Sequence, residues 1–208
     1  MIRVHRIPFS TNVERVALGC ALKGVPVEWI DHDPGRRGEL LRLSGQELTP
    51  VAEFGADVLV DSIAILRRLD RDYPQPRLFP GDPTEWAVAE LFVEWFNEVW
   101  KRPPNALASA SPPTGAEAEA LADGVRAWSR RFERMLSARE FLLGDRIGIA
   151  DVCAYPFLRY ARDDPSPGDG DPFHAVLREL LAGGSDPCLD RWIVRVESQP
   201  PTPPPWAP

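Results

Sequence analysis

The amino-acid sequence predicts an α/β domain followed by an all-α domain, and three observations lead to this fold class. About the first thirty residues read as strand, helix and strand, which is a βαβ unit with a parallel pair of strands. Residues 48–72 read as a hairpin of two short strands that runs directly into a helix. After a proline-rich break at residues 73–81, the apolar spacing is helical throughout. The expected parts are a first domain at residues 1–75, a linker at 76–82, a helical domain at 83–199 and a proline-rich tail at 200–208.

The elements of the first domain follow from local patterns. Thr11, with a glutamate three residues later, fits a capping box at the start of the first helix, and Gly24 is a helix-stop signal. Gly55 supplies the turn of the hairpin, and Asp61-Ser62 fits the cap of the helix that follows it. The expected elements are strands at residues 2–7, 25–30, 51–54 and 58–60, and helices at 11–23, 36–41 and 62–72.

Local signals also define the helices of the second domain. Asp82-Pro83 is a helix start, with Asp as the cap and Pro at the first helical position. The long helix that follows is apolar over much of its circumference, and Pro103-Pro104 is expected to stop or kink it. Gly148 fits the N-cap of a later helix, with Asp151 three residues on reaching back to the N–H of the cap. The remaining helices are expected at residues 115–137 and from Asp171-Pro172 and Asp186-Pro187 onward.

The composition excludes several classes of protein. The chain has 208 residues, of which 44 % are hydrophobic, enough for one large domain or two small ones packed together. The net charge of −7 argues against nucleic acid as a partner, because no basic stripe can dominate the field. The first residues lack the apolar run of a signal peptide, and no segment approaches the length of a membrane span. We therefore expect a cytoplasmic protein with no membrane partner.

The cysteines indicate neither a zinc ribbon nor a dithiol redox motif. Cys20, Cys153 and Cys188 are far apart and show no C-x-x-C spacing. Cys20 and Cys153 lie in apolar helical stretches, so we expect buried thiols in a reducing compartment. Because metal-ligand spacing is absent from the sequence, no metal is expected.

Two motifs, taken in order, resemble those of a known family. Thr49-Pro50 stands just before the first strand of the hairpin, and Asp61-Ser62 stands where the second strand becomes a helix. Together they resemble the second half of the thioredoxin-like domain of glutathione transferases, and residues 141–151 resemble the capping-box segment of that family's helical domain. The resemblance implies a serine-type cytosolic enzyme similar to bacterial and zeta-like members, with glutathione as co-substrate and a homodimer as the assembly.

The resemblance also implies where glutathione binds. In the family a cis-proline loop holds the cysteinyl part of glutathione, and here that loop is Thr49, Pro50 and Val51. An acidic residue followed by serine at a helix start holds the γ-glutamyl end, which implies Asp61 and Ser62. The glycyl carboxylate needs a cation or an amide donor, and the candidates in the right segment are Arg36, Arg37 and Gln46. Both arginines fit a solvated helix face equally well.

Ser10 is the candidate catalytic residue. It lies five residues before Arg15, a spacing that resembles the catalytic serine or cysteine of zeta-like, omega-like and many bacterial glutathione transferases. The implied role is a hydrogen bond to the glutathione sulfur, since a hydroxyl donor at a helix start lowers a thiol pKa from about 8.5 and favours the thiolate. The alternative is that Ser10 only caps the helix, and Thr11 and Asn12 are further candidates within one turn.

The predicted reaction is attack of the glutathione thiolate on a small hydrophobic electrophile bound near Phe9, or a glutathione-dependent isomerisation or peroxide reduction. Because position 10 is not a cysteine, a thiol reductase that works through a mixed disulfide is disfavoured. The first tyrosine is Tyr73, which excludes a tyrosine-type transferase.

Two departures from the family pattern keep other functions open. The family usually has Ser or Thr where this chain has Gly148, and Val-Pro where this chain has Thr49-Pro50. The alternatives are a non-catalytic binding or interaction protein of the same fold, and an enzyme that uses a thiol other than glutathione.

Overall fold

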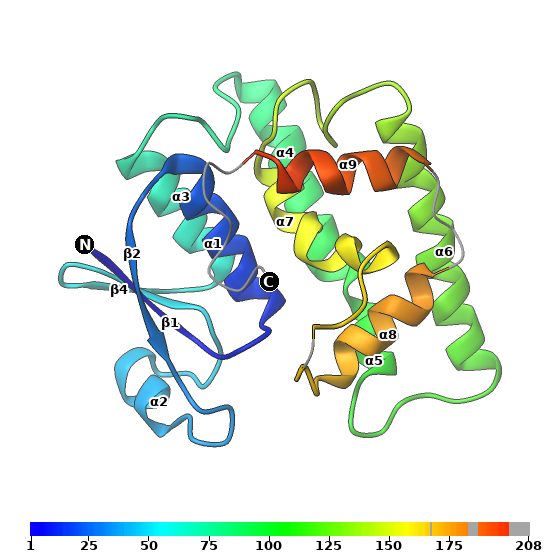
Figure 1. Ribbon diagram of the computed structural model, residues 1–208, viewed down its shortest axis with the longest axis horizontal. Coiled ribbons are helices and arrows are strands. Elements are labelled where there is room, and N and C mark those ends of the chain that lie inside the picture. Colours follow the sequence, from blue (N-terminus) through cyan, green and yellow to red (C-terminus); the bar gives the residue numbers. More distant parts are fainter. Residues whose placement is uncertain (167, 183–186, 200–208) are drawn as a thin grey trace. The chain divides into compact units, whose positions relative to one another are not determined.

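The computed structural model describes residues 1–166, 168–182 and 187–199, and these divide into two compact units (Figure 1). One unit contains Met1–Phe79 with the described residues 197–199, and the other contains Pro80–Val196. The expected tail at residues 200–208 and the expected cap Asp186 lie outside the described residues.

The first unit is a mixed four-stranded sheet with three helices, in the predicted order βαβαββα. The strand order is β2-β1-β3-β4; β1 runs parallel to β2 and antiparallel to β3, and β3 runs antiparallel to β4. The α/β fold class of this unit is therefore confirmed. Its elements are β1 (Ile2–Arg6), α1 (Thr11–Lys23), β2 (Val27–Asp31), α2 (Gly38–Ser44), β3 (Val51–Phe54), β4 (Asp57–Val60) and α3 (Ser62–Asp72).

Helices α1 and α3 pack side by side in this unit (Figure 1). Gly19 lies where they approach most closely, because a Cβ atom at this position would collide with the side chain of Leu66. Val4 on β1 and Val16 on α1 are fully buried beneath them. This tight packing holds the starts of both helices in fixed positions relative to the sheet.

The N-cap of α1 lies one residue before the predicted one. Ser10, not Thr11, is the N-cap: its backbone is extended (φ −75°, ψ 113°) and its Oγ accepts a hydrogen bond from Val13 N at 3.4 Å. Ser10 O also accepts the first helical hydrogen bond, from Glu14 N at 2.9 Å. Thr11 is already helical and buried, so the predicted capping box between Thr11 and Glu14 was wrong.

The second unit is all-helical in its described residues, as predicted. Its helices are α4 (Pro83–Trp95), the π-helical η1 (Phe96–Trp100), α5 (Arg102–Leu107), α6 (Ala116–Leu136), α7 (Ile149–Leu158), the 3₁₀ turn η2 (Arg159–Ala161), α8 (Pro172–Leu181) and α9 (Pro187–Glu197). Asp82 caps α4 as expected, accepting from the N–H groups of Thr84 and Glu85. Pro103 and Pro104 sit in the first turn of α5, where a missing N–H leaves no helical hydrogen bond unmade.

The predicted capping motif at α7 is confirmed, and its Asp151 accepts more hydrogen bonds than the capping bond alone. Asp151 Oδ2 accepts from Gly148 N at 3.0 Å, which is the capping bond. Asp151 Oδ1 also accepts from Leu142 N at 2.9 Å and from Trp192 Nε1 on α9 at 2.8 Å. One buried carboxyl group therefore joins the preceding connector, α7 and α9.

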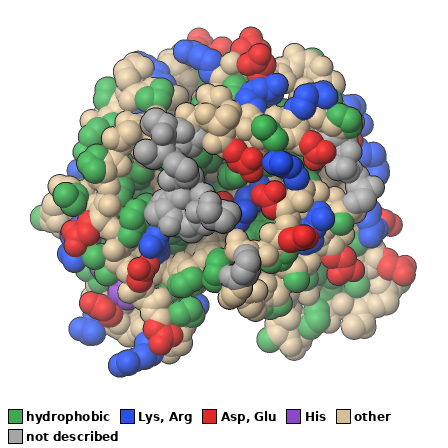
Figure 2. All heavy atoms as spheres, viewed as in Figure 1, with side chains coloured by type: hydrophobic (Ala, Val, Ile, Leu, Met, Phe, Trp, Pro, Cys, Tyr) green, Lys and Arg blue, Asp and Glu red, His purple; other side chains and the backbone are tan. Residues whose placement is uncertain are grey.

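On the face shown in Figure 2, acidic and basic side chains are interspersed rather than gathered by sign. Among the described helices, none combines the length and the apolar character needed to cross a bilayer.

Candidate functional site

Three chain segments that carry predicted site residues meet at one edge of the sheet in the first unit. His5 near the end of β1 pairs with Val51 at the start of β3, and Val51 pairs with Val60 at the end of β4. The turn after β1, the loop before β3 and the junction after β4 therefore lie side by side. These segments contain Ser10, Thr49, Pro50, Val51, Asp61 and Ser62.

Two residues with unusual backbone conformations stand at the two helix starts of this edge. Phe9 has φ 59° and precedes Ser10, and Asp61 has φ 71° and precedes Ser62. They are the non-glycine residues with positive φ in the described part of the chain. Such conformations cost on the order of 1–3 kcal/mol and cluster at functional sites, which makes these two turns candidates for ligand contact.

Asp61 uses one carboxylate oxygen to cap α3. Asp61 Oδ1 accepts from Ile63 N and from Ala64 N, each at 2.9 Å. Two N–H groups at the start of α3 are therefore already bonded within the protein. Ser62, which is buried, is left as the polar side chain of this helix start.

Arg15 connects the starts of α1 and α3, and the sequence analysis did not identify it as a site residue. Its guanidinium group is buried, and Nη1 donates to Asn12 Oδ1 at 3.1 Å and to Ser62 Oγ at 3.4 Å. The available signal was an arginine inside a run of apolar helical residues, a position where burial requires hydrogen-bonding partners. Asn12 and Ser62, from different helices, are thus brought together by one cation.

The loop before β3 is compact. The Thr49–Pro50 peptide bond is cis, Pro50 is buried and Val51 is fully buried at the start of the strand. Within the described residues, the buried hydroxyl oxygen of Thr49 has no hydrogen-bonding partner. A buried polar atom of this kind is commonly satisfied by an ordered water or by a ligand.

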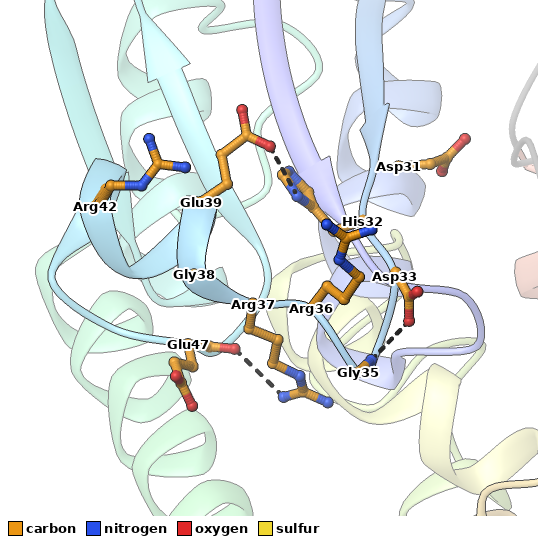
Figure 3. Close-up of a pocket in the computed structure, with 10 residues that line it drawn as sticks. All are labelled: Asp31, His32, Asp33, Gly35, Arg36, Arg37, Gly38, Glu39, Arg42 and Glu47. Carbon is orange, nitrogen blue, oxygen red and sulfur yellow. Dashed lines mark hydrogen bonds and ion pairs between the residues drawn. The ribbon is translucent and has the colours of Figure 1, made fainter.

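Arg37 lies in a cavity of about 680 Å³ between the end of β2 and α2 (Figure 3). Its Nε donates to Pro34 O at 2.9 Å and its Nη1 to Glu47 O at 3.3 Å, so the guanidinium group touches backbone oxygens and no carboxylate in these contacts. Arg36 lines the same cavity and is exposed, whereas Gln46 is half-buried outside its lining. The structure therefore groups both arginines but leaves Gln46 apart from them.

Cys20 is not a second candidate nucleophile. It is buried in α1, and burial raises the pKa of its thiol to about 12, although Lys23 opposes the shift. A thiol in this state is protonated and unreactive at neutral pH. No cluster of three or more metal-ligating side chains occurs within the described residues.

Comparison with known families covers both units. Residues 4–77 match the N-terminal domain of glutathione S-transferases, and residues 92–195, half of the chain, match the C-terminal domain. A solved structure of rice GST1 in complex with glutathione has a TM-score of 0.71 at 22 % identity and covers 93 % of this chain and 86 % of that chain. At this identity the likeness shows the fold.

The curated relatives are similarly distant. A probable glutathione S-transferase of Nicotiana tabacum is 26 % identical over 148 residues, which are 70 % of this chain and 65 % of that protein. The match thus spans just under two thirds of the length of that relative. A maleylpyruvate isomerase of a Ralstonia species is 38 % identical over 77 residues, which are 35 % of this chain and 36 % of that protein.

Proposed function

Because the chain belongs to the glutathione S-transferase family, we propose that it binds glutathione in its first unit and promotes attack of the thiolate on a small hydrophobic electrophile. Ser10 donates to the sulfur and residues 49–51 hold the cysteinyl part. Asp61 and Ser62 hold the γ-glutamyl end, and Arg37 or Gln46 holds the glycyl carboxylate.

The observation that carries this proposal is the direction of two hydrogen bonds. Val13 N donates to Ser10 Oγ, and Arg15 Nη1 donates to Ser62 Oγ. An amide N–H and a guanidinium group can only donate, so each hydroxyl is the acceptor and keeps its own hydrogen. Both serines are therefore arranged to donate to a bound anion, such as a thiolate or a carboxylate.

This arrangement supports thiol activation. A hydroxyl hydrogen bond at the start of α1 stabilises the thiolate more than the thiol, which lowers the thiol pKa from about 8.5 toward neutrality. The thiolate then attacks the electrophilic atom with its electron pair and forms the new sulfur bond. In a substitution the leaving group departs with its bonding pair, and in an addition solvent supplies the proton.

A glutathione-dependent isomerisation is the second candidate reaction. It is supported by the match to the Ralstonia maleylpyruvate isomerase, which has the highest identity among the relatives described above. In such a reaction the thiolate adds reversibly to a double bond and leaves again, so the thiol is regenerated.

Calorimetric titration with reduced glutathione, followed by turnover assays, tests the proposal. Ser62→Ala should weaken binding, and Ser10→Ala should lower turnover while the protein stays folded. Ser137→Ala is the matched control, because this exposed hydroxyl donates to Arg134 O on its own helix. Absence of binding to wild type would overturn the glutathione proposal and leave another thiol or a binding role.

A homodimer is the proposed assembly. Helix α4 and the following η1 carry apolar side chains that are exposed in the single chain: Val88 is 50 %, Leu91 65 % and Val99 40 % exposed. Exposed apolar residues at this helical spacing indicate a surface that a partner covers.

A further inference from the structure

Arg15 is buried to a degree that is unusual for a charged side chain. It is 1 % exposed and stands on α1 next to the fully buried Val16. A charged side chain is rarely covered to this extent unless polar groups surround its charge. Its Nη1 donates to Asn12 Oδ1 at 3.1 Å on the same helix and to Ser62 Oγ at 3.4 Å on α3. The guanidinium group therefore lies between the starts of the two helices.

Packing alone does not account for this buried cation. Helices α1 and α3 already approach closely at Gly19, and Lys23 joins their other ends by donating to Asp70 Oδ1 at 2.7 Å. That contact pairs opposite charges, whereas Asn12 Oδ1 and Ser62 Oγ are neutral oxygen atoms. Hydrogen bonds between two charged groups are shorter and stronger than those to neutral acceptors. The contacts of Arg15 are thus better suited to orient polar groups than to fasten helices.

The guanidinium group sets the polarity of both partners. It has no acceptor atom, so each oxygen atom that it contacts must accept. Ser62 Oγ therefore keeps its own hydrogen for another acceptor. Asn12 has its carbonyl oxygen held toward Arg15, so its NH₂ group points in a different direction. Both partners become hydrogen-bond donors with a fixed direction.

Without the cation, the two partners would be free to bond to each other. Both oxygen atoms lie within 3.4 Å of the same nitrogen atom, Arg15 Nη1, and are therefore close together. A hydroxyl hydrogen rotates toward an available acceptor, and Asn12 Oδ1 would be one for Ser62. The hydrogen of Ser62 would then be turned into the protein and lost to a ligand.

Separate contacts hold the backbone around Ser62. Asp61, at φ 71°, precedes it, and Asp61 Oδ1 accepts from Ile63 N and from Ala64 N at 2.9 Å each. This cap does not involve Arg15. Loss of the guanidinium group should therefore change the direction of the Ser62 hydroxyl while the start of α3 stays in place.

We propose that Arg15 is a positioning residue for the γ-glutamyl end of the bound thiol peptide. It acts through Ser62, whose hydroxyl hydrogen it keeps available for the ligand carboxylate. The inference rests on the proposed function, because Ser62 is the ligand contact in that proposal.

A double-mutant cycle tests whether Arg15 acts through Ser62. Calorimetry gives the Kd of reduced glutathione for wild type, Arg15→Met, Ser62→Ala and the double variant. Each single variant should bind about tenfold more weakly, because each loses one hydrogen bond to a charged group. The double variant should bind no more weakly than the single variants, since both changes remove the same hydrogen bond. Losses that multiply in the double variant would overturn the inference.

Lys23→Met is the matched control, because it removes another buried cation that joins α1 and α3, at the ends away from Ser62. Its Kd for glutathione should stay within about twofold of the wild-type value, even though the protein is less stable. An equal loss of affinity in Lys23→Met and Arg15→Met would show general loosening of the two helices and contradict the inference. Arg15→Lys keeps a buried donor for Ser62 and should recover most of the affinity.

A readout on the unaltered protein makes the test independent of variant folding. The ¹⁵N-edited spectrum of the guanidinium groups contains a signal from Arg15, assigned by its absence in Arg15→Lys. Glutathione should shift this signal, and cysteinylglycine, which lacks the γ-glutamyl end, should leave it in place. Equal shifts with both ligands, or none with bound glutathione, would overturn the inference alone. If wild type binds no glutathione, the proposed function fails and this inference fails with it.

Discussion

At the scale of single residues, Asp151 shows how burial and hydrogen bonding oppose each other in one carboxyl group. Burial raises its pKa to about 6, although the N–H groups of Leu142, Trp192 and Gly148 favour the ionised form. The unfolded-state pKa is near 3.9, so the folded protein retains a proton that the unfolded chain has released. The contribution of Asp151 to the free energy of unfolding therefore falls as pH rises from about 4 to about 6, and is constant above that window.

We predict that Asp151→Asn removes this pH dependence. The wild-type free energy of unfolding, measured against the variant by urea titration, should decrease by up to about 3 kcal/mol between pH 4 and pH 7. The variant is also less stable by about 1–3 kcal/mol, because its amide NH₂ group faces the N–H of Gly148. A wild-type-to-variant difference that stays constant with pH would contradict the raised pKa.

Some residues of the candidate site could be predicted from the sequence, and others could not. The helix start at Asp61 and Ser62 was readable from a local capping pattern, whereas Ser10 was proposed from a spacing that resembles the family's. Arg15 was missed, because its role depends on Ser62 lying next to it in space, 47 residues later in the chain. The cap of α1 was misplaced by one residue because both Ser10 and Thr11 have the side chain that an N-cap needs.

At the scale of elements, hydrogen bonds join the C-terminal end of α1 to the end of α3 and to the residues that follow α3. Lys23 Nζ, whose side chain is fully buried, donates to Asp70 Oδ1 at 2.7 Å, Tyr73 O at 2.7 Å and Pro76 O at 2.6 Å. Asp70 in turn accepts from Leu78 N and Phe79 N. All three donor hydrogens of the ammonium group are used.

Lys23→Met should lower the free energy of unfolding by about 3 kcal/mol, because it leaves the carboxylate of Asp70, which is only 12 % exposed, without its cation. Arg102→Met is the control: its ion pair with Glu98 is exposed and 3.8 Å long, and its loss should change the stability by less than about 0.5 kcal/mol. Urea denaturation followed by circular dichroism measures both. Equal changes in the free energy of unfolding for the two variants would show that the hydrogen bonds of Lys23 add no more stability than an exposed ion pair does.

The order and type of the elements were largely predictable, because amphipathic spacing, caps and turn residues are local signals. The hairpin, the start of α3 and the cap of α4 came from such signals. The π-helical turn Phe96–Trp100 was not predicted, since no local signal separates it from the α-helix before it. The cavity at β2 was also beyond the sequence, because it depends on how residues 31–47 pack against the sheet.

At the scale of the whole molecule, the proposed homodimer should depend on the exposed apolar residues of α4. Leu91→Arg places a charge in the middle of that surface and should convert a dimer into a monomer in sedimentation velocity experiments at micromolar concentration. Leu41→Arg on α2 is the control, because Leu41 is similarly exposed, at 46 %, but lies on another element. A wild-type chain that sediments as a monomer would contradict the proposed assembly.

The burial of Lys23 has a practical consequence for chemical labelling. The sequence contains 22 arginines but only two lysines, Lys23 and Lys101. Since the Lys23 amine is covered and donates three hydrogen bonds, an amine-reactive reagent should modify it only slowly. The rate at which Lys23 is modified therefore reports how often the chain opens locally where the first unit ends. Peptide mass spectrometry measures this rate without a substitution in the protein.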